Sequence, residues 1–303
     1  MSRILAGMPR HAPHPHPKEA QTKPPYSAEK QAPPGKEKEM TPAADHGEKN
    51  YTGNARLRDK AAIITGSDSG IGRAVAIAYA REGADLVLSY LPEEQDDARE
   101  TARWVEEAGR KALLIPGDVG KKKYCEKLVE TATNKLGKLD IVVNNAGFQR
   151  TYDDLGDVPE DEFERTFRTN VFGTFFLSQA AAEVLPKGGS IINTCSIQAY
   201  EPSENLVAYA PTKAALVSLT KVLAKTLAKK QIRVNGVAPG PVWTPLIPST
   251  MPKEKLKEFG KNTLFERAAQ PAELAPLFVF LASQDATYVT AEIYGATGGR
   301  TPY

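Results

Sequence analysis

Histidine is almost absent from this chain. The 303-residue sequence has four histidines, and all of them, His11, His14, His16 and His46, lie within the first 46 residues. The rest of the chain therefore lacks the side chain needed for a Ser-His hydrolase mechanism, for histidine-ligated zinc or for histidine acid/base catalysis. Any proton transfer in the globular part has to use another kind of side chain.

Cysteine, net charge and long apolar runs are also scarce. The two cysteines, Cys125 and Cys195, have no CxxC spacing, which argues against a zinc site or a disulfide framework and favours a reducing compartment. The 39 Lys and Arg residues nearly balance the 37 Asp and Glu residues, unlike the basic composition of a nucleic-acid-binding protein. No run reaches the roughly 18 apolar residues of a membrane helix, and no secretory signal is present. We expect a cytoplasmic protein that binds neither nucleic acid nor membranes.

The first 54 residues differ in composition from the rest. They are rich in Pro, Lys, Glu and His and show no sustained apolar period, which predicts a mostly disordered tail over residues 1–54. The HxxHxH cluster in this tail could bind a transition metal weakly, but a solvated segment interrupted by prolines is the favoured interpretation. No metal site is assigned.

From residue 55 onward, short β-branched or apolar runs alternate with longer amphipathic stretches, as in βαβ units. Strands are predicted over residues 61–65, 85–90, 111–118, 139–145, 190–195, 232–239 and 292–297. Helices are predicted over residues 71–83, 93–109, 123–137, 159–185, 206–230 and 271–283. The pattern predicts a single α/β domain with a Rossmann-type, doubly wound, parallel seven-stranded sheet over residues 55–303. In such sheets ligands bind beyond the carboxyl ends of the strands, where the strand order reverses.

A glycine-rich loop stands between the first predicted strand and the first predicted helix. Its glycines, Gly66, Gly70 and Gly72, have the spacing GxxxGxG. Gly66 permits a tight turn, Gly70 lets the backbone approach a pyrophosphate, and Gly72 lets helix and strand pack closely. Glycines also end strands for purely structural reasons, but the position between strand and helix favours a dinucleotide site.

Polar residues end the third and fourth predicted strands at the same edge of the sheet. These are Asp118 and the run from Asn144 to Gly147. A carboxylate at this edge can accept a hydrogen bond from an adenine amino group. Taken singly, Asp118 could instead cap the following helix and Asn144 could close a turn. Their coincidence with the glycine loop favours the cofactor interpretation.

A candidate catalytic group follows the fifth strand. Ser196 comes directly after it, and Tyr209 and Lys213 stand four residues apart in a helical segment. This spacing places the two side chains on one helix face, about 5 to 6 Å apart at Cβ, so that the ammonium can favour the phenolate. To act near neutrality the tyrosine needs its pKa lowered by roughly 3, which corresponds to about 4 kcal/mol. An isolated YxxxK is more often a half-buried tyrosine beside a surface lysine, but here the strand and serine precede it.

These motifs together resemble the classical short-chain dehydrogenases/reductases. The residues TGSDSGIG, NNAG, Ser196, YAPTK and Pro239-Gly240 have that family's order and spacing over roughly residues 57–299. The resemblance implies an NAD(P)-dependent oxidoreductase that interconverts an alcohol and a carbonyl. It implies that Tyr209 is the general acid/base and that Lys213 lowers its pKa and binds the nicotinamide ribose. It also implies that Ser196 binds the substrate oxygen and that Asn170 belongs to a proton relay.

The same resemblance implies which residues contact the cofactor. It makes residues 245–270 a mobile segment that covers the substrate, and it implies a homotetramer. The predicted cofactor-binding residues are Gly66, Ser67, Asp68, Ser69, Gly70, Ile71, Gly72, Tyr90, Asp118, Val119, Asn144, Ala146, Gly147, Tyr209, Lys213, Pro239, Gly240, Val242 and Thr244.

A narrower similarity concerns the substrate and the choice of cofactor. The stretches DSGIGRA, IQAY, GPVWTPLIP, RAAQPAELAP and YVTAE are similar to a group of bacterial stress-type NADP-dependent aldehyde reductases and plant glucose and ribitol dehydrogenase homologues. This group implies an aldehyde, sugar or polyol substrate. The second strand ends in Tyr90, where NAD enzymes carry an acid, which leans slightly toward NADP. No Arg or Lys follows within residues 91–97, so NAD remains open.

Two other functions are compatible with the fold. A nucleotide-binding sensor could keep the cofactor site and report its state to a partner, but the complete set of Ser196, Tyr209, Lys213 and Asn170 argues against a silent protein. Sugar-nucleotide epimerisation normally needs a larger C-terminal substrate region than the roughly sixty residues after the sixth strand.

Overall fold

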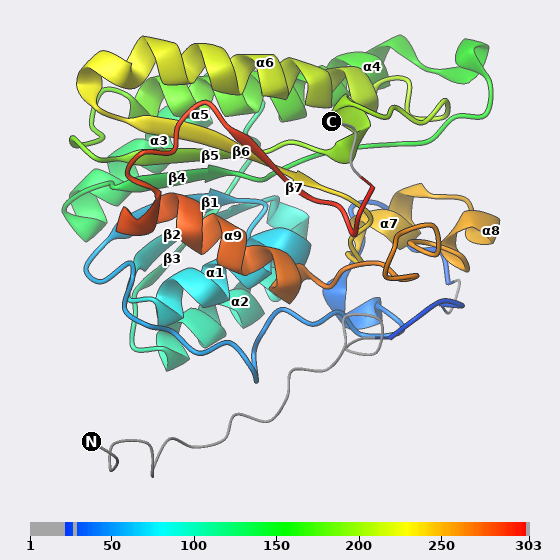
Figure 1. Cartoon of the computed structure of the whole chain (residues 1–303), viewed down its shortest axis with the longest axis horizontal. Coiled ribbons are helices and arrows are strands. Elements are labelled where there is room, and N and C mark those ends of the chain that lie inside the picture. Colours follow the sequence, from blue (N-terminus) through cyan, green and yellow to red (C-terminus); the bar gives the residue numbers. More distant parts are fainter. Residues whose placement is uncertain (1–21, 27–28, 301–303) are drawn as a thin grey trace, which may run out of the picture.

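Seven parallel strands form the central sheet (Figure 1). The structure is a computed structural model, and it describes residues 22–26 and 29–300. Their order across the sheet is β3-β2-β1-β4-β5-β6-β7, which confirms the predicted doubly wound fold. Most strand residues are buried, because helices cover both faces, and this explains the continuous apolar runs. The strands are β1 (Ala61–Thr65), β2 (Asp85–Tyr90), β3 (Ala112–Pro116), β4 (Ile141–Asn144), β5 (Ser190–Thr194), β6 (Arg233–Pro239) and β7 (Ile293–Ala296).

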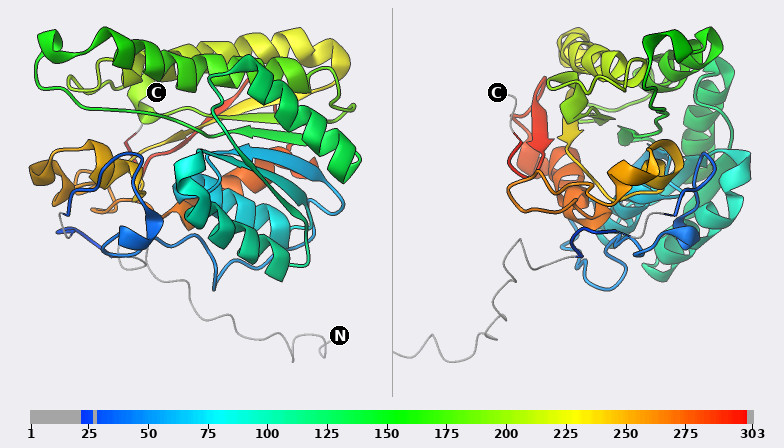
Figure 2. Two further views of the ribbon diagram at one scale, coloured as in Figure 1. Left: turned by 180° about the vertical axis from the view of Figure 1, so that it is seen from behind. Right: turned by 90° about the vertical axis from the view of Figure 1, so that its right-hand side faces the viewer.

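Helices form a layer on each face of the sheet (Figures 1 and 2). One layer contains α1 (Gly70–Arg81), α2 (Gln95–Glu107) and α9 (Pro271–Ala282). The other contains α3 (Lys122–Thr131), α4 (Glu160–Phe167), α5 (Gly173–Ala181) and α6 (Tyr209–Leu227). A π-helical turn, Arg168–Phe172, joins α4 to α5 inside the single helical stretch that the sequence predicts over residues 159–185.

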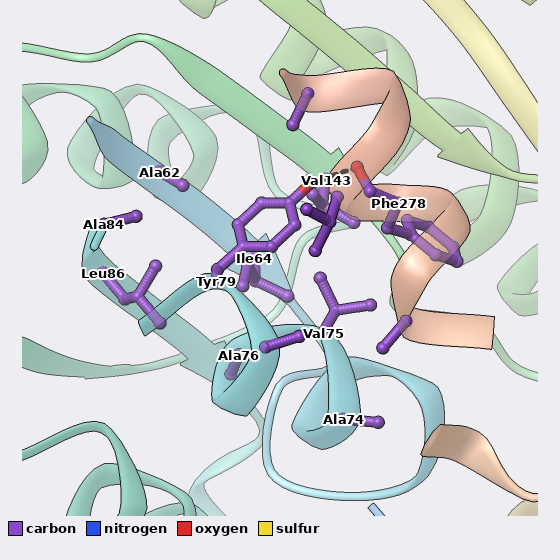
Figure 3. Packing of buried hydrophobic residues seen from close by; sticks show 14 of the residues in the cluster. Ala62, Ile64, Ala74, Val75, Ala76, Tyr79, Ala84, Leu86, Val143 and Phe278 are labelled. Atoms are coloured by element: carbon purple, nitrogen blue, oxygen red, sulfur yellow. Dashed lines mark hydrogen bonds between the residues drawn. The ribbon is translucent and has the colours of Figure 1, made fainter. Parts of the chain in front are cut away.

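The core between α1, α9 and the sheet shows why this layer is so closely packed (Figure 3). Ala74, Val75 and Ala76 of α1 are small or β-branched, which lets the helix approach the strands closely. Tyr79 is completely buried there, and its hydroxyl donates a hydrogen bond to the carbonyl oxygen of Phe278 at 3.0 Å. The tyrosine therefore adds apolar contact area without leaving a buried donor unpaired.

The N-terminal region differs from the expected disordered tail wherever the structure describes it. Residues 22–26 and 29–48, called here the N-terminal strap, run beside the segment that carries α7 (Leu246–Thr250) and α8 (Lys253–Leu256) (Figures 1 and 2). Tyr26 stacks on Trp243 with ring centroids 4.4 Å apart, and Trp243 Nε1 donates to the carbonyl oxygen of Pro42 at 2.8 Å. Composition missed this packing because the surface that receives the strap comes from residues about 200 positions away. The cluster from His11 to His16 lies outside the described residues.

None of the helices in the described ranges is long and apolar enough to cross a membrane.

Candidate active site

The glycine loop connects β1 to α1 and has the backbone that its glycines were expected to provide. Gly66 and Gly70 have φ values of +60° and +49°, in the left-handed region that favours glycine. A Cβ on Gly72 would lie 1.8 Å from the carbonyl oxygen of Gly66, so a side chain there would block the packing of α1. The side-chain amide of Asn145 donates to the carbonyl oxygens of Thr65 and Gly66 and so links the end of β4 to this loop.

A pocket of about 1530 Å³ opens at the carboxyl ends of the strands. It exceeds the roughly 300–1,000 Å³ of ordinary small-ligand pockets, as a site for a dinucleotide together with a substrate should. The predicted site residues that line it are Gly66, Asp68, Ser69, Gly70, Ile71, Tyr90, Asp118, Val119, Ala146, Gly147, Ser196, Tyr209, Lys213, Pro239, Gly240, Val242 and Thr244. The structure therefore brings the two predicted groups, nucleotide and catalytic, to one cavity.

Three predicted cofactor residues lie behind the pocket wall. The Ser67 hydroxyl donates to the carbonyl oxygen of Ser89, and Gly72 supports the glycine loop from within α1. The Asn144 amide donates to the side chains of Ser178 and Asn193 and so links β4 to its neighbours. These residues shape the site without lining the pocket.

Asn170 is also buried behind the pocket, in the π-helical turn between α4 and α5. Its Oδ1 accepts from the Phe148 amide at 2.8 Å, and its Nδ2 donates to the Phe148 carbonyl oxygen and to Thr212. A Cβ on Gly147 would lie 3.7 Å from Asn170 Oδ1 and 3.9 Å from Lys213 Nζ. The glycine therefore leaves the space between these two polar groups free of a side chain. Single π-turns inside helices are frequent at functional sites.

Tyr209, at the first turn of α6, meets Ser196 and Lys213 at the end of β5. Burial raises the pKa of Tyr209 to about 12, although a hydrogen bond with Ser196 acts in the opposite direction. Burial lowers the pKa of Lys213 to about 8. Lys213 Nζ donates to the carbonyl oxygen of Thr194 at 2.8 Å and lies 5.2 Å from the centroid of the Tyr209 ring. The ammonium of Lys213 thus donates to β5, and the lowering of the Tyr209 pKa by this lysine stays a prediction.

Acidic side chains surround the other end of the pocket, beyond β2. Asp118 Oδ1 accepts from the Gly120 amide at 2.8 Å and so stabilises the turn after β3, while the residue also lines the pocket. Asp68 and Glu94 line the same cavity. Burial raises the pKa of both carboxyl groups, and the charge of Asp68 raises that of Glu94 further. An acid was expected only at the end of β2, so Glu94, which lines the pocket from the turn that follows β2, was not predicted.

Other pocket residues had no clear signal in the sequence. Pro33 and Pro34 of the strap line the cavity, and only the packing of the strap brings them there. Gln149 and Gln198 also line it, two residues after the predicted Gly147 and Ser196. The Gln149 amide donates to the Thr250 hydroxyl at 2.9 Å, which connects the loop after β4 to α7. Their nearness to predicted residues was the only available clue.

Comparison with known proteins gives matches over most of the chain. The family model described as Enoyl-(Acyl carrier protein) reductase matches residues 65–301. An uncharacterized oxidoreductase, YghA, of Escherichia coli (strain K12) is 52% identical over 275 residues, which cover 90% of this chain and 94% of that protein. The NADPH-dependent aldehyde reductase 1, chloroplastic, of Arabidopsis thaliana is 42% identical over 274 residues, covering 88% and 95%.

Solved structures show the same architecture. A short-chain dehydrogenase from Burkholderia cenocepacia J2315 in complex with NADP is 31% identical and superposes with a TM-score of 0.75, covering 80% of this chain and 98% of that chain. A short-chain type dehydrogenase/reductase from Mycobacterium marinum is 34% identical with a TM-score of 0.72, covering 81% and 96%. The similarity therefore extends over about four fifths of this chain and nearly the whole of each solved chain.

Proposed function

Because the chain belongs to the short-chain dehydrogenase/reductase family of oxidoreductases, we propose that it interconverts an alcohol and a carbonyl compound with NAD or NADP. The observation that supports this most directly is the meeting of Ser196, Tyr209 and Lys213 on the wall of one cavity. The glycine loop lines the same cavity, so a nucleotide and a reacting carbon can lie together in it.

The cofactor site fits a dinucleotide. The loop from Gly66 to Ile71 presents backbone to the pocket at the N-terminus of α1, where a pyrophosphate is favoured by free amides and the helix dipole. We assign the other end of the cofactor to the wall formed by Lys213, Pro239, Gly240 and Thr244. When bound, the nicotinamide supplies or accepts the hydride.

Tyr209 is the proposed general acid in the direction of carbonyl reduction. Its raised pKa keeps the phenol protonated at neutral pH, which is the form that donates a proton to a carbonyl oxygen. The Ser196 hydroxyl is placed to bind the same substrate oxygen. Lys213 is placed to bind the ribose, and Asn170 to pass protons through the space that Gly147 leaves open.

The proposed substrate is an aldehyde, a sugar or a polyol. Amide side chains of Gln149, Gln198 and Asn205 line the cavity and can hydrogen-bond the hydroxyl groups of such a compound. Relatives named for aldehyde reduction and as glucose and ribitol dehydrogenase homologues support the same class. The absence of an acid at Tyr90 leans slightly toward NADP, whereas the carboxylate of Asp68 favours a cofactor without the extra phosphate.

We also propose a homotetramer located in the cytoplasm. Phe172, Phe175 and Val222 are large apolar side chains exposed near or on α5 and α6, which supports association through these helices. Both cysteines are free buried thiols, which supports a reducing compartment.

The decisive experiment follows absorbance at 340 nm with purified protein, NADPH and NADH separately, and a panel of aldehydes, sugars and polyols. The reverse reactions with NADP and NAD are run on the corresponding alcohols. Turnover with one cofactor is expected and will identify the substrate class. Tight cofactor binding with no turnover on any compound would contradict the proposed activity and favour the sensor.

A further inference from the structure

The N-terminus of α1 is capped by a residue from outside the glycine loop. The first four amides of a helix lack partners within it, and a side chain at the preceding residue usually accepts from one of them. Ser69 holds that preceding position, but its side chain makes no such bond. Instead, Glu37 Oε2 accepts from the Gly70 amide at 2.9 Å. The strap therefore supplies the cap across 33 positions of sequence.

The position of Glu37 is unusual for an acidic residue. Its side chain is only 6% exposed, and Oε1 has no hydrogen-bond partner among the residues that the structure describes. Burying a carboxylate with an unpaired oxygen is costly, and a neutral cap from residue 69 would satisfy the helix more cheaply. The helix end alone therefore does not account for this arrangement.

His46 lies beside Glu37 inside the strap. Its Nε2 is 3.2 Å from Glu37 Oε2, and its Nδ1 is 3.0 Å from Glu48 Oε1. Burial by itself lowers the pKa of His46, but the two carboxylates outweigh it and raise the pKa to about 9. His46, together with the positive charge of Arg73, holds the pKa of Glu37 below its ordinary value. At neutral pH the buried imidazolium of His46 thus lies between the carboxylates of Glu37 and Glu48.

Glu37 contacts the glycine loop without lining the pocket. Gly66, Asp68, Ser69, Gly70 and Ile71 line the pocket, whereas Glu37 does not. The Glu37 amide is itself held by Asp97 Oδ2 at 3.0 Å, which fixes the strap against α2. The strap therefore holds the glycine loop through Glu37, while the loop residues that line the pocket stay accessible to a ligand.

The strap also contacts residues 245–270, the segment that we expect to cover the substrate. The Gln31 amide donates to the carbonyl oxygen of Pro248 at 3.1 Å, and the Ala268 amide donates to the Tyr26 hydroxyl. A Cβ on Gly35 would lie 2.6 Å from the carbonyl oxygen of Pro245, so strap and segment are in close contact. One continuous stretch of chain thus touches both ends of the active site.

We propose that Glu37 is a positioning residue for the nicotinamide cofactor. Glu37 caps α1 and fixes the Gly70 amide, while His46 neutralises the charge of the Glu37 carboxylate. The neutralisation matters because the cofactor pyrophosphate is an anion that binds at the same helix N-terminus. An uncompensated carboxylate there would repel it. The inference rests on the proposed use of NAD or NADP.

The test compares Glu37→Ala and Glu37→Gln with a matched control, Glu39→Gln. Glu39 lies in the same helical turn, but it is exposed and forms an ion pair with Lys36 at 3.4 Å. Dissociation constants for NADP and NAD are measured by fluorescence titration of the full-length protein. The unfolding temperature without cofactor, and kcat and KM for the cofactor, are measured in parallel.

We expect Glu37→Ala to bind the cofactor about tenfold more weakly or worse, which is equivalent to about 1.4 kcal/mol. Its kcat at saturating cofactor should stay within about twofold of the wild type. Glu37→Gln keeps an oxygen within reach of Gly70 and should restore most of the affinity. If Glu37→Ala does not fold, Glu37→Asp replaces it, because aspartate keeps the charge but is one methylene short of the amide.

The role of His46 is tested with His46→Gln and with the double variant Glu37→Gln/His46→Gln. The single variant leaves the Glu37 carboxylate beside Gly70 without its imidazolium partner and should weaken cofactor binding. The double variant should regain affinity because the charge at Gly70 is gone, although the carboxylate of Glu48 remains. Unchanged affinity in His46→Gln would overturn the neutralising role. A Glu37→Ala protein with wild-type affinity, even one with a lower unfolding temperature, would overturn the positioning role. Failure of the wild type to bind either nucleotide would instead overturn the proposed function, and this inference with it.

Discussion

Replacing Tyr209 by phenylalanine removes one hydroxyl group and leaves the ring in place. General acid/base catalysis typically contributes about 10²- to 10⁴-fold, or roughly 3 to 5 kcal/mol of activation free energy. We expect a loss of kcat toward the upper end of this range. The phenol of Tyr209 is protonated at neutral pH, and it is a stronger acid than the Ser196 hydroxyl beside it, which is why we propose the tyrosine as the proton donor.

The assay measures kcat at 340 nm with saturating cofactor and the best substrate of the panel, alongside the dissociation constant of the cofactor. Tyr79→Phe is the matched control, because Tyr79 is also buried and its hydroxyl also makes a hydrogen bond, but to Phe278 in the core. The control should lose about 1 kcal/mol of stability and keep its kcat. Tyr209→Phe should bind the cofactor within about threefold of the wild type.

The result that refutes the reasoning is a Tyr209→Phe enzyme that retains kcat within tenfold of the wild type while binding the cofactor normally. Such an enzyme would obtain its proton from another group, and the assignment of the general acid would fail.

Two further predictions concern pH and the strap. The kcat/KM for carbonyl reduction should fall as pH rises through about 8, because Lys213 is charged below that pH and neutral above it. Tyr209, with a pKa near 12, stays protonated over this range. A flat profile from pH 7 to 10 would contradict this prediction. Tyr26→Ala should raise the KM for the substrate about two- to tenfold, since stacking on Trp243 contributes about 0.5–1.5 kcal/mol to holding the strap beside residues 245–270, which we expect to cover the substrate. Tyr288→Ala, at a fully exposed tyrosine, serves as its control, and equal KM values in the two variants would exclude this role for the strap.

Features with a local cause could be predicted from the sequence. The strands were recognisable because continuous apolar runs are needed in a parallel sheet covered on both faces. The spacing of Gly66, Gly70 and Gly72 follows from steric limits that act within one turn of chain. The structure places Gly66 directly after β1, and it places Gly70 and Gly72 in the first turn of α1. The register of Tyr209 and Lys213 is fixed by helix geometry.

The partners of individual side chains were decided by the tertiary structure. Helix spacing placed Lys213 beside Tyr209, but the carbonyl oxygen of Thr194 on β5 determines where its ammonium lies. The end of β2 lacks an acid, yet Glu94 brings one to the same cavity from the next turn.

The N-terminal strap gives the clearest contrast between the two levels. Its own residues cannot form a core, and composition alone predicts disorder. The strap packs on the ring of Trp243 and hydrogen-bonds to the backbone amides of Gly70 and Ala268. These three residues come together only when the sheet and its loops are in place. The sequence by itself therefore determined the fold and the order of the catalytic motifs, because periodicity and steric limits act over a few residues. Only the tertiary structure decided which distant surfaces complete the site, because those surfaces do not exist until the chain has folded.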